Sequence, residues 1–173
     1  MTHIISPTGK DISLTPDDFI VSKTDPKGRI TYANRVFMSV SGYKESELLG
    51  VQQNIVRHPD MPRAIFKLLW ETIQSGNECF AYIKNLCKNG DHYWVCANVS
   101  PDYDSHGGLN GYFSVRRKPK QEAVDYFSQL YKEMLSAEVR SDSGGAIQAS
   151  SDILHHAITE QGFESYESFV LGF

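Results

Sequence analysis

Two neighbouring runs of alternating residues constrain the fold of this chain more than any other feature of its sequence. The runs are "CFAYIKNL", residues 79–86, and "HYWVCANVS", residues 92–100, and the "CKNGD" that joins them places Asn89 and Gly90 at a turn. An Asn-Gly pair between two alternating runs is the strongest short-range signal for a β-hairpin, because both residues tolerate the positive φ angles of a type I′ turn. An antiparallel sheet must therefore form at least part of the core.

The rest of the first 120 residues supplies three more strands and a helical segment between them. "FIVSKTD" and "RITYAN" flank the turn residues "PKG", and "LNGYFSVRRK" follows the turn-rich "DYDSHGG". Between the second and third strands, apolar residues recur at helical spacing, in two short helices that end at Gly42 and Gly50 and a longer one that ends at Ser75. We predict an α+β domain over residues 18–120, in which a five-stranded antiparallel sheet carries short helices on one face. A hollow between the sheet and these helices is a common place for a ligand.

Both ends of the chain lie outside this domain. Residues 1–17 have little periodicity and are predicted to be an N-terminal arm, either loose or capping the domain. Residues 121–173 are predicted to be a C-terminal helical extension, with an amphipathic helix, a break at "RSDSGGA" and a second helix from about Ser151. We expect the apolar face of this extension both to pack on the domain and to contact a partner.

The composition argues against several classes of function. The chain has 17 basic and 21 acidic residues and a net charge of -4, so neither nucleic acid nor an anionic membrane is an expected partner. Its apolar runs are shorter than the roughly 20 residues of a membrane-spanning helix, and no secretory signal opens the chain. We therefore expect a cytoplasmic protein without direct membrane insertion. The three cysteines form no CxxC pair and the histidines belong to no recognised catalytic motif, so we expect no metal site, no catalytic residues and no enzyme activity.

A charged cluster directly before an apolar helix marks one part of the predicted hollow. In "NIVRHPDMPRAIFKLLW", residues 54–70, Asp60 is placed to cap the helix, whose first turn tolerates Pro62. On the third strand, alternation places Asn85 on an otherwise apolar face. An amide on such a face needs hydrogen-bond partners, which either the core or a bound heteroaromatic ligand would supply. Both alternatives stay open at this point.

Several of these motifs together resemble those of a known family of sensors. The segments "HPDMP", "FKLLW", "KNGDHYWV" and "GYFSVRRKP", with the opening strand hairpin, resemble the PAS sensors of the Aer family, which detect cellular redox state for aerotaxis and energy taxis. The resemblance covers about residues 18–120 and is closest to the stand-alone, CetB-type members of that family. It implies a PAS fold that holds FAD noncovalently in the predicted hollow.

The resemblance also implies which residues bind the cofactor. They are Asn34, Arg57, His58, Asp60, Trp70 and Asn85. Arg57 would hold the pyrophosphate through charge-assisted hydrogen bonds, and Trp70 would lie near the flavin ring. Each residue also has an ordinary alternative, since Asn34 and Asp60 suit helix caps and Trp70 has the spacing of a core aromatic.

Two positions depart from related flavin proteins. Asn54 is followed by Ile55, where related light sensors carry the cysteine that forms a photoadduct, so light-driven adduct chemistry is not expected. Gln53 stands where the Aer family can carry a histidine, which alters one contact beside the flavin.

The implied function is that of a sensor which signals the redox state of FAD to a membrane-anchored, chemoreceptor-like transducer, with which the protein would associate. A homodimer is compatible with the resemblance, and the outer face and ends of the sheet are the expected output surface. Two alternatives stay open. One is a haem-binding PAS sensor of gas or redox state, with His58 or another helix histidine as axial ligand. The other is a ligand-free PAS module that acts through protein contacts alone.

Overall fold

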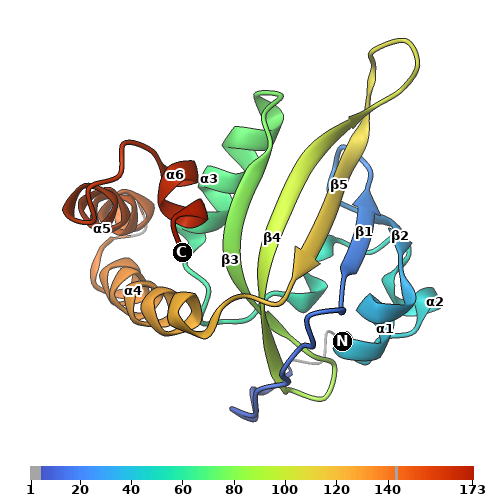
Figure 1. Cartoon of the computed structure of the whole chain (residues 1–173), viewed down its shortest axis with the longest axis horizontal. Helices are drawn as coiled ribbons and strands as arrows, with labels where there is room; N and C mark the ends of the chain where they lie inside the picture. Colours follow the sequence, from blue (N-terminus) through green and yellow to red (C-terminus); the bar gives the residue numbers. More distant parts are fainter. Residues whose placement is uncertain (1–4, 143) are drawn as a thin grey trace.

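The computed structural model describes residues 5–142 and 144–173. Its centre is a five-stranded antiparallel sheet in the order β2-β1-β5-β4-β3 (Figure 1). The strands are β1 (Ile20–Thr24), β2 (Ile30–Ala33), β3 (Cys79–Leu86), β4 (His92–Tyr103) and β5 (Leu109–Arg117). The helices are α1 (Arg35–Ser41), α2 (Glu45–Leu48), the 3-10 turn η1 (Gln53–Val56), α3 (Arg63–Gln74), α4 (Gln121–Arg140), α5 (Ala146–Glu160) and α6 (Tyr166–Leu171). The predicted α+β architecture with C-terminal helices is confirmed.

The predicted turns form where their residues allow them. Gly90 has a φ of 93° between β3 and β4, and Gly28 has a φ of 79° between β1 and β2. Gly42, with a φ of 76°, closes α1 in the left-handed conformation. These are backbone states that a residue with a Cβ adopts at a cost, so the glycines fix the element boundaries at the predicted places.

One face of the sheet is covered by the helices between β2 and β3. Along β3 and β4, residues of one parity point to this inner face, where α3 packs across both strands. The β3–β4 register sets Asn85 opposite Tyr93 and Lys84 opposite Trp94. Asn85 therefore faces the inner side and Lys84 the outer side, as the alternation predicts.

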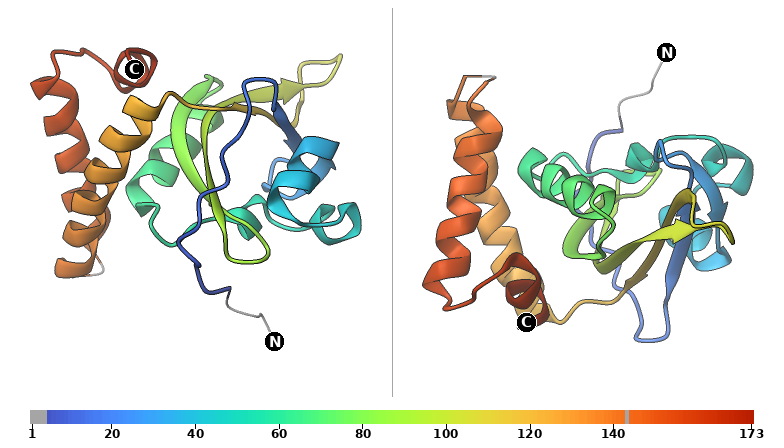
Figure 2. Two further views of the ribbon diagram at one scale, coloured as in Figure 1. Left: turned by 60° about the horizontal axis from the view of Figure 1, so that its bottom comes forward. Right: turned by 90° about the horizontal axis from the view of Figure 1, so that it is seen from above.

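The C-terminal extension covers part of the other face of the sheet. Helix α4 packs on β3 and β4, where the Tyr131 hydroxyl donates to the Tyr82 carbonyl oxygen at 2.7 Å. The ring of Phe127 lies 4.5 Å from that of Tyr82, and Tyr131 stacks on Trp94 at 6.1 Å. Figure 2 shows α4 and α5 side by side. Self-packing of the extension is thus confirmed, and α4 covers part of the outer face of β3 and β4, which is the expected output surface.

The second helix of the extension starts earlier than predicted. Helix α5 begins at Ala146 and not near Ser151. Its first turn is stabilised by backbone bonds from Gly145 and Ala146 to the Asp142 carbonyl oxygen, and Ala146 is fully buried. Burial of this small residue extends the helix into a segment whose glycines and serines favour a loop.

The N-terminal arm caps the domain. The Ile12 amide donates to the His92 carbonyl oxygen at 2.7 Å and the His92 amide to the Lys10 carbonyl oxygen at 2.9 Å. Strand β5 ends opposite Cys96, so the arm occupies the side of β4 that β5 leaves open. Of the two alternatives for the arm, the structure shows the capping one. Within the described parts of the chain, no helix has the length and apolar character needed to cross a membrane.

Candidate functional site

A cavity of about 210 Å³ lies between the inner face of the sheet and the segment from η1 to α3. Helix α3 gives it an apolar wall of Phe66, Leu69, Trp70 and Ile73. The opposite wall comes from β3, β4 and β5. Gln52 and Asn54 also line it and are exposed, so the cavity opens to solvent beside η1.

Trp70 is held in place from two sides. Its ring meets that of Tyr112 edge to face, with the centroids 5.5 Å apart. On the other side, a Cβ added to Gly28 would lie 3.0 Å from the Trp70 ring. The hairpin glycine therefore serves both the turn and the close approach of the backbone to this wall.

Three polar residues from three elements meet at one end of the cavity. An Arg116 Nη2 on β5 donates to the Ser22 hydroxyl on β1 at 2.5 Å, and that hydroxyl donates to Gln53 Oε1 at 3.2 Å. The Arg116 guanidinium also lies over the Phe37 ring, 4.6 Å from its centroid. These hydrogen bonds fix the side chains of Arg116 and Gln53 but use only some of the hydrogen-bonding groups of each.

Two buried donors are left over at that polar end. Gln53 Nε2 and Arg116 Nε have no hydrogen-bond partner among the residues that the structure describes. A buried donor without a partner destabilises a fold by about 1–3 kcal/mol, and native proteins carry few of them. Both residues line the cavity, so a ligand with acceptor atoms at this end is a candidate partner for the two groups.

The charge of the cavity is positive. Arg57 and Arg116 line it, and among the described residues no aspartate or glutamate does. Loss of hydration on burial lowers the pKa of Arg116 to about 10, which leaves it charged at neutral pH. The cavity therefore favours ligands that are electron-rich or anionic where they meet Arg116.

Three of the six predicted site residues do line the cavity, namely Arg57, Trp70 and Asn85. The backbones of Arg57 and Asn85 form an isolated antiparallel bridge, which ties the loop before α3 to β3. The guanidinium of Arg57 lies 4.2 Å from the centroid of the Phe66 ring. Burial lowers the pKa of Arg57, and nearby Glu138 partly offsets this effect.

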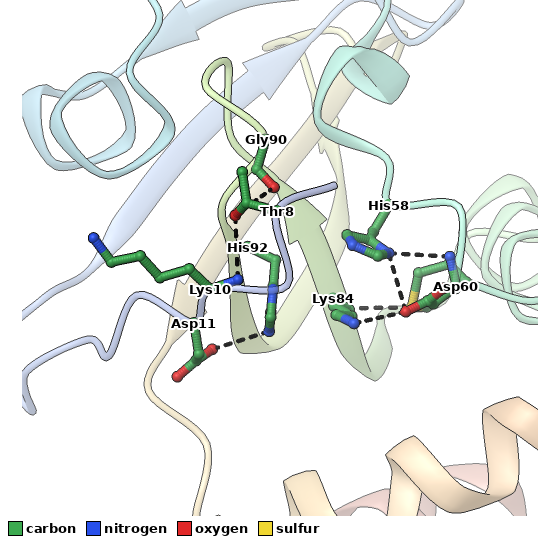
Figure 3. A network of polar contacts seen from close by, with 9 residues as sticks. Thr8, Lys10, Asp11, His58, Asp60, Lys84, Gly90 and His92 are labelled. Atoms are coloured by element: carbon green, nitrogen blue, oxygen red, sulfur yellow. Dashed lines mark hydrogen bonds and ion pairs between the residues drawn. The ribbon is translucent and has the colours of Figure 1, made fainter. Parts of the chain in front are cut away.

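His58 and Asp60 do not line the cavity, and both belong to a polar network with Lys84 of β3 (Figure 3). His58 is buried, its Nδ1 accepts from the Asp60 amide at 3.0 Å, and its ring lies 5.7 Å from that of His92. The Asp60 carboxylate accepts from Lys84 Nζ at 2.7 Å. These two residues therefore hold the loop to β3 and to the start of β4, where the arm is bound.

Asn34 is fully engaged as a helix cap. Its Oδ1 accepts from the amides of Phe37 at 3.0 Å and Val21 at 3.1 Å, and its Nδ2 donates to the Phe19 carbonyl oxygen at 2.8 Å. It does not line the cavity. The ordinary alternative for this residue, an N-cap, is confirmed.

The cap predicted for Asp60 is wrong. Helix α3 begins after Pro62, which is its N-cap and supplies no side-chain bond. The carboxylate at this helix start is that of Glu138 on α4, which accepts from the Ala64 amide at 3.2 Å and from Arg63 Nε at 3.3 Å. Asp60 is instead drawn to Lys84, because that ammonium lies on the neighbouring strand.

Comparison with known proteins agrees with this geometry. Residues 17–118 match the PAS fold. The chain belongs to the PAS family. It is 42% identical over 127 residues to the aerotaxis receptor of Escherichia coli K12. The aligned region covers 73% of this chain and 25% of the receptor. The resemblance of the sequence motifs to aerotaxis PAS sensors is thereby confirmed.

Two further comparisons place the PAS domain more broadly. It is 28% identical over 97 residues to the nitrogen fixation regulatory protein of Klebsiella pneumoniae, over 56% of this chain and 20% of that one. A light-oxygen-voltage domain, solved in a study of a flavin analogue, superposes with a TM-score of 0.56 at 22% identity, over 64% of this chain and 83% of its own. That likeness shows the fold alone. The chain spans about a quarter or less of the length of the curated relatives named here.

Two contributors to the polar end of this PAS cavity, Ser22 and Arg116, are absent from the residues predicted from sequence. A usable signal existed for Arg116. In "GYFSVRRK" it has the same parity as Tyr112 and Ser114, so alternation places one arginine on the inner face. Ser22 gave no such signal, because a serine in a short strand suits either face. The sequence marks Gln53 only as a departure from the family, whereas the structure shows that Gln53 lines the cavity.

Proposed function

We propose that the cavity binds FAD noncovalently and that the protein senses redox state through this flavin. The observation that carries the proposal is the pair of buried, unpartnered donors on Gln53 and Arg116, next to the apolar wall around Trp70. A flavin ring system is flat, with an apolar end and an edge of acceptor oxygens and nitrogens. When bound, it supplies a centre that accepts and releases electrons.

The size of the cavity supports a proposed division of the cofactor between the cavity and its mouth. A volume of about 210 Å³ is below the roughly 300 Å³ at which common ligand pockets begin. It would bury the ring, and the phosphates would lie outside. Arg57 is half-buried beside the exposed Asn54, so its guanidinium is placed to meet the pyrophosphate at the mouth.

Asn85 is placed to link the ligand to the rest of the domain. It lines the cavity, and its backbone is bridged to that of Arg57. We propose that a change in the charge or protonation of the ring shifts the hydrogen bonds around Asn85 and thus the loop before α3. Through Glu138, which binds the start of α3, such a shift would reach the C-terminal helices.

The partner in this proposal is a membrane-anchored, chemoreceptor-like transducer. The support is the 42% identity to the aerotaxis receptor. The match spans 25% of that receptor, and we propose the transducer as the partner that receives the signal. The proposed role is binding and signalling at the cytoplasmic side of a membrane receptor, without catalytic turnover.

An absorption spectrum of the protein as purified tests the proposal. We expect flavin bands in the blue and near ultraviolet, and FAD in the supernatant after heat denaturation, separated from FMN by chromatography. A colourless protein that does not take up added FAD would contradict it. A spectrum with a Soret band would instead favour a haem sensor, but His58 does not line the cavity and so gives haem no axial ligand there. The ligand-free alternative leaves the two buried donors unexplained.

A further inference from the structure

Among the residues that the structure describes, no acidic group balances the buried guanidinium of Arg116. Its hydrogen-bond acceptor is the neutral Ser22 hydroxyl, and its other close neighbour is the Phe37 ring. No ion pair involves Arg116 within the part of the chain that the structure describes. The ionisable side chain that acts on it is Tyr93, and burial raises the pKa of that phenol, so it is neutral at physiological pH.

A buried charge without an opposite charge nearby destabilises the folded state, so the presence of Arg116 in the core calls for an explanation. Burial of a charge without a partner destabilises a protein by several kcal/mol, and replacement by an apolar group would remove that penalty. Arg116 is 4% exposed, lines the cavity, and keeps its Nε free of any bond to the described residues. The balancing negative charge is therefore expected in the cavity itself.

Arg57 is a weaker candidate for this role. It is half-buried near the mouth, its charge already lies against the Phe66 ring, and Glu138 acts on it favourably. Solvent and Glu138 therefore screen Arg57, whereas Arg116 is screened by neither. A charge that develops deep in the cavity would be met by Arg116.

We propose that Arg116 stabilises the negative charge of the reduced flavin ring, so that the cavity holds the reduced cofactor as an anion and favours reduction. This inference rests on the proposed flavin site. In the step concerned, an external reductant gives two electrons to the oxidised ring, and one proton from solvent forms an N–H bond on it. The ring then carries one negative charge, and the reductant is oxidised by the same two electrons. Without Arg116, a second proton would be needed to neutralise the ring.

The first test compares midpoint potentials of whole protein loaded with FAD, titrated with dithionite and mediators. The variants are Arg116→Gln, the charge-retaining Arg116→Lys, and Arg117→Gln, which removes the same charge from the exposed neighbouring position. At a given potential, we expect the ratio of reduced to oxidised flavin to be at least tenfold lower in Arg116→Gln than in the wild type. For a two-electron couple, a tenfold change corresponds to a midpoint potential that is lower by about 30 mV. Arg117→Gln should match the wild type and Arg116→Lys should lie closer to it. Equal potentials for Arg116→Gln and Arg117→Gln would overturn the proposal.

A second test uses the wild type alone and is independent of whether a variant folds. Its midpoint potential is followed from pH 5.5 to 6.5. One proton taken up with two electrons gives a slope of about 30 mV per pH unit, and two protons give about 59 mV. Neither Tyr93 nor Tyr112 ionises in this range, because burial raises the pKa of both. The lower slope is expected, and the higher slope would show a neutral reduced ring and overturn the inference. A protein that binds no flavin at all would refute the proposed function itself.

Discussion

Glu138 on α4 and Ala64 in the first turn of α3 are joined by a hydrogen bond of 3.2 Å from the backbone amide to the carboxylate. The carboxylate also accepts from Arg63 Nε at 3.3 Å, and Glu138 is buried. A helix N-terminus has unpaired amides and a partial positive charge, so this contact is favourable in both respects. The C-terminal extension is thereby attached to the helix that walls the cavity.

Replacement of Glu138 by alanine should loosen this attachment. The Ala64 amide would lose its acceptor in a buried position, and we expect the free energy of unfolding to fall by about 1–3 kcal/mol. Glu138→Gln keeps an acceptor oxygen and loses only the charge, so its effect should be smaller. Urea unfolding followed by circular dichroism measures both. Glu133→Ala, on the exposed side of the same helix, is the control, and an equal loss there would mean that removal of any carboxylate from α4, and not of this contact, is responsible.

The fold was predictable to a large extent because its signals are local. The Asn89-Gly90 turn, the helix stop at Gly42 and the alternation that turns Asn85 inward each depend on neighbours in sequence. Each is found at the predicted place, although Asn89 does not adopt the positive φ of a type I′ turn. The start of α5 at Ala146 differs from the predicted start near Ser151. Burial in the folded protein, and not local helix propensity, extends that helix.

The site was predictable only in part because its contacts are not local. The sequence predicts Asp60, three residues before α3, as the helix cap. The acceptor for the Ala64 amide is instead Glu138 on α4, 74 positions from Ala64. The polar end of the cavity joins Ser22 to Arg116 across 94 positions. Such pairs form only when β1 and β5 become neighbours in the sheet. No motif in either strand predicts that these two strands are neighbours.

Gly28→Ala should disturb the cavity wall as well as the hairpin. The residue has a φ of 79°, and the added Cβ would lie 3.0 Å from the Trp70 ring, which Tyr112 holds from the other side. We expect a loss of stability of about 1–3 kcal/mol from backbone strain, with a further about 1 kcal/mol or more from the contact. Gly50→Ala is the matched control, because its φ is also 79° and its Cβ would meet nothing within 4 Å. If the two variants unfold at the same urea concentration and tryptophan emission is unchanged, the contact with Trp70 has no energetic weight.

The stability of the protein should fall as the pH drops below about 6.5. Burial, with a smaller effect from Lys84, lowers the pKa of His58 to about 4. The unfolded chain then binds a proton that the folded chain does not, so acid favours unfolding until the pH reaches the folded value. His58 contributes a loss of about 2 kcal/mol between pH 7 and pH 5. Unfolding in urea at several pH values measures it. His58→Gln should flatten the profile, while replacement of the exposed His155 should not; equal profiles for both variants would contradict this origin.

Arg57→Ala should weaken ligand binding far more than it weakens the fold. The side chain is half-buried and its contact is with the Phe66 ring, so we expect its removal to change the free energy of unfolding by only about 0.5–1 kcal/mol. A guanidinium bound to a pyrophosphate through charge-assisted hydrogen bonds contributes about 1.5–3 kcal/mol, which predicts a loss of FAD affinity of roughly ten- to a hundredfold. Titration of the apoprotein with FAD, followed by quenching of flavin fluorescence, measures the affinity. Arg63→Ala removes the same charge from the first residue of α3, which does not line the cavity. If it reduced the affinity as much as Arg57→Ala, general electrostatic attraction would explain the effect, and Arg57 would have no direct contact with the cofactor.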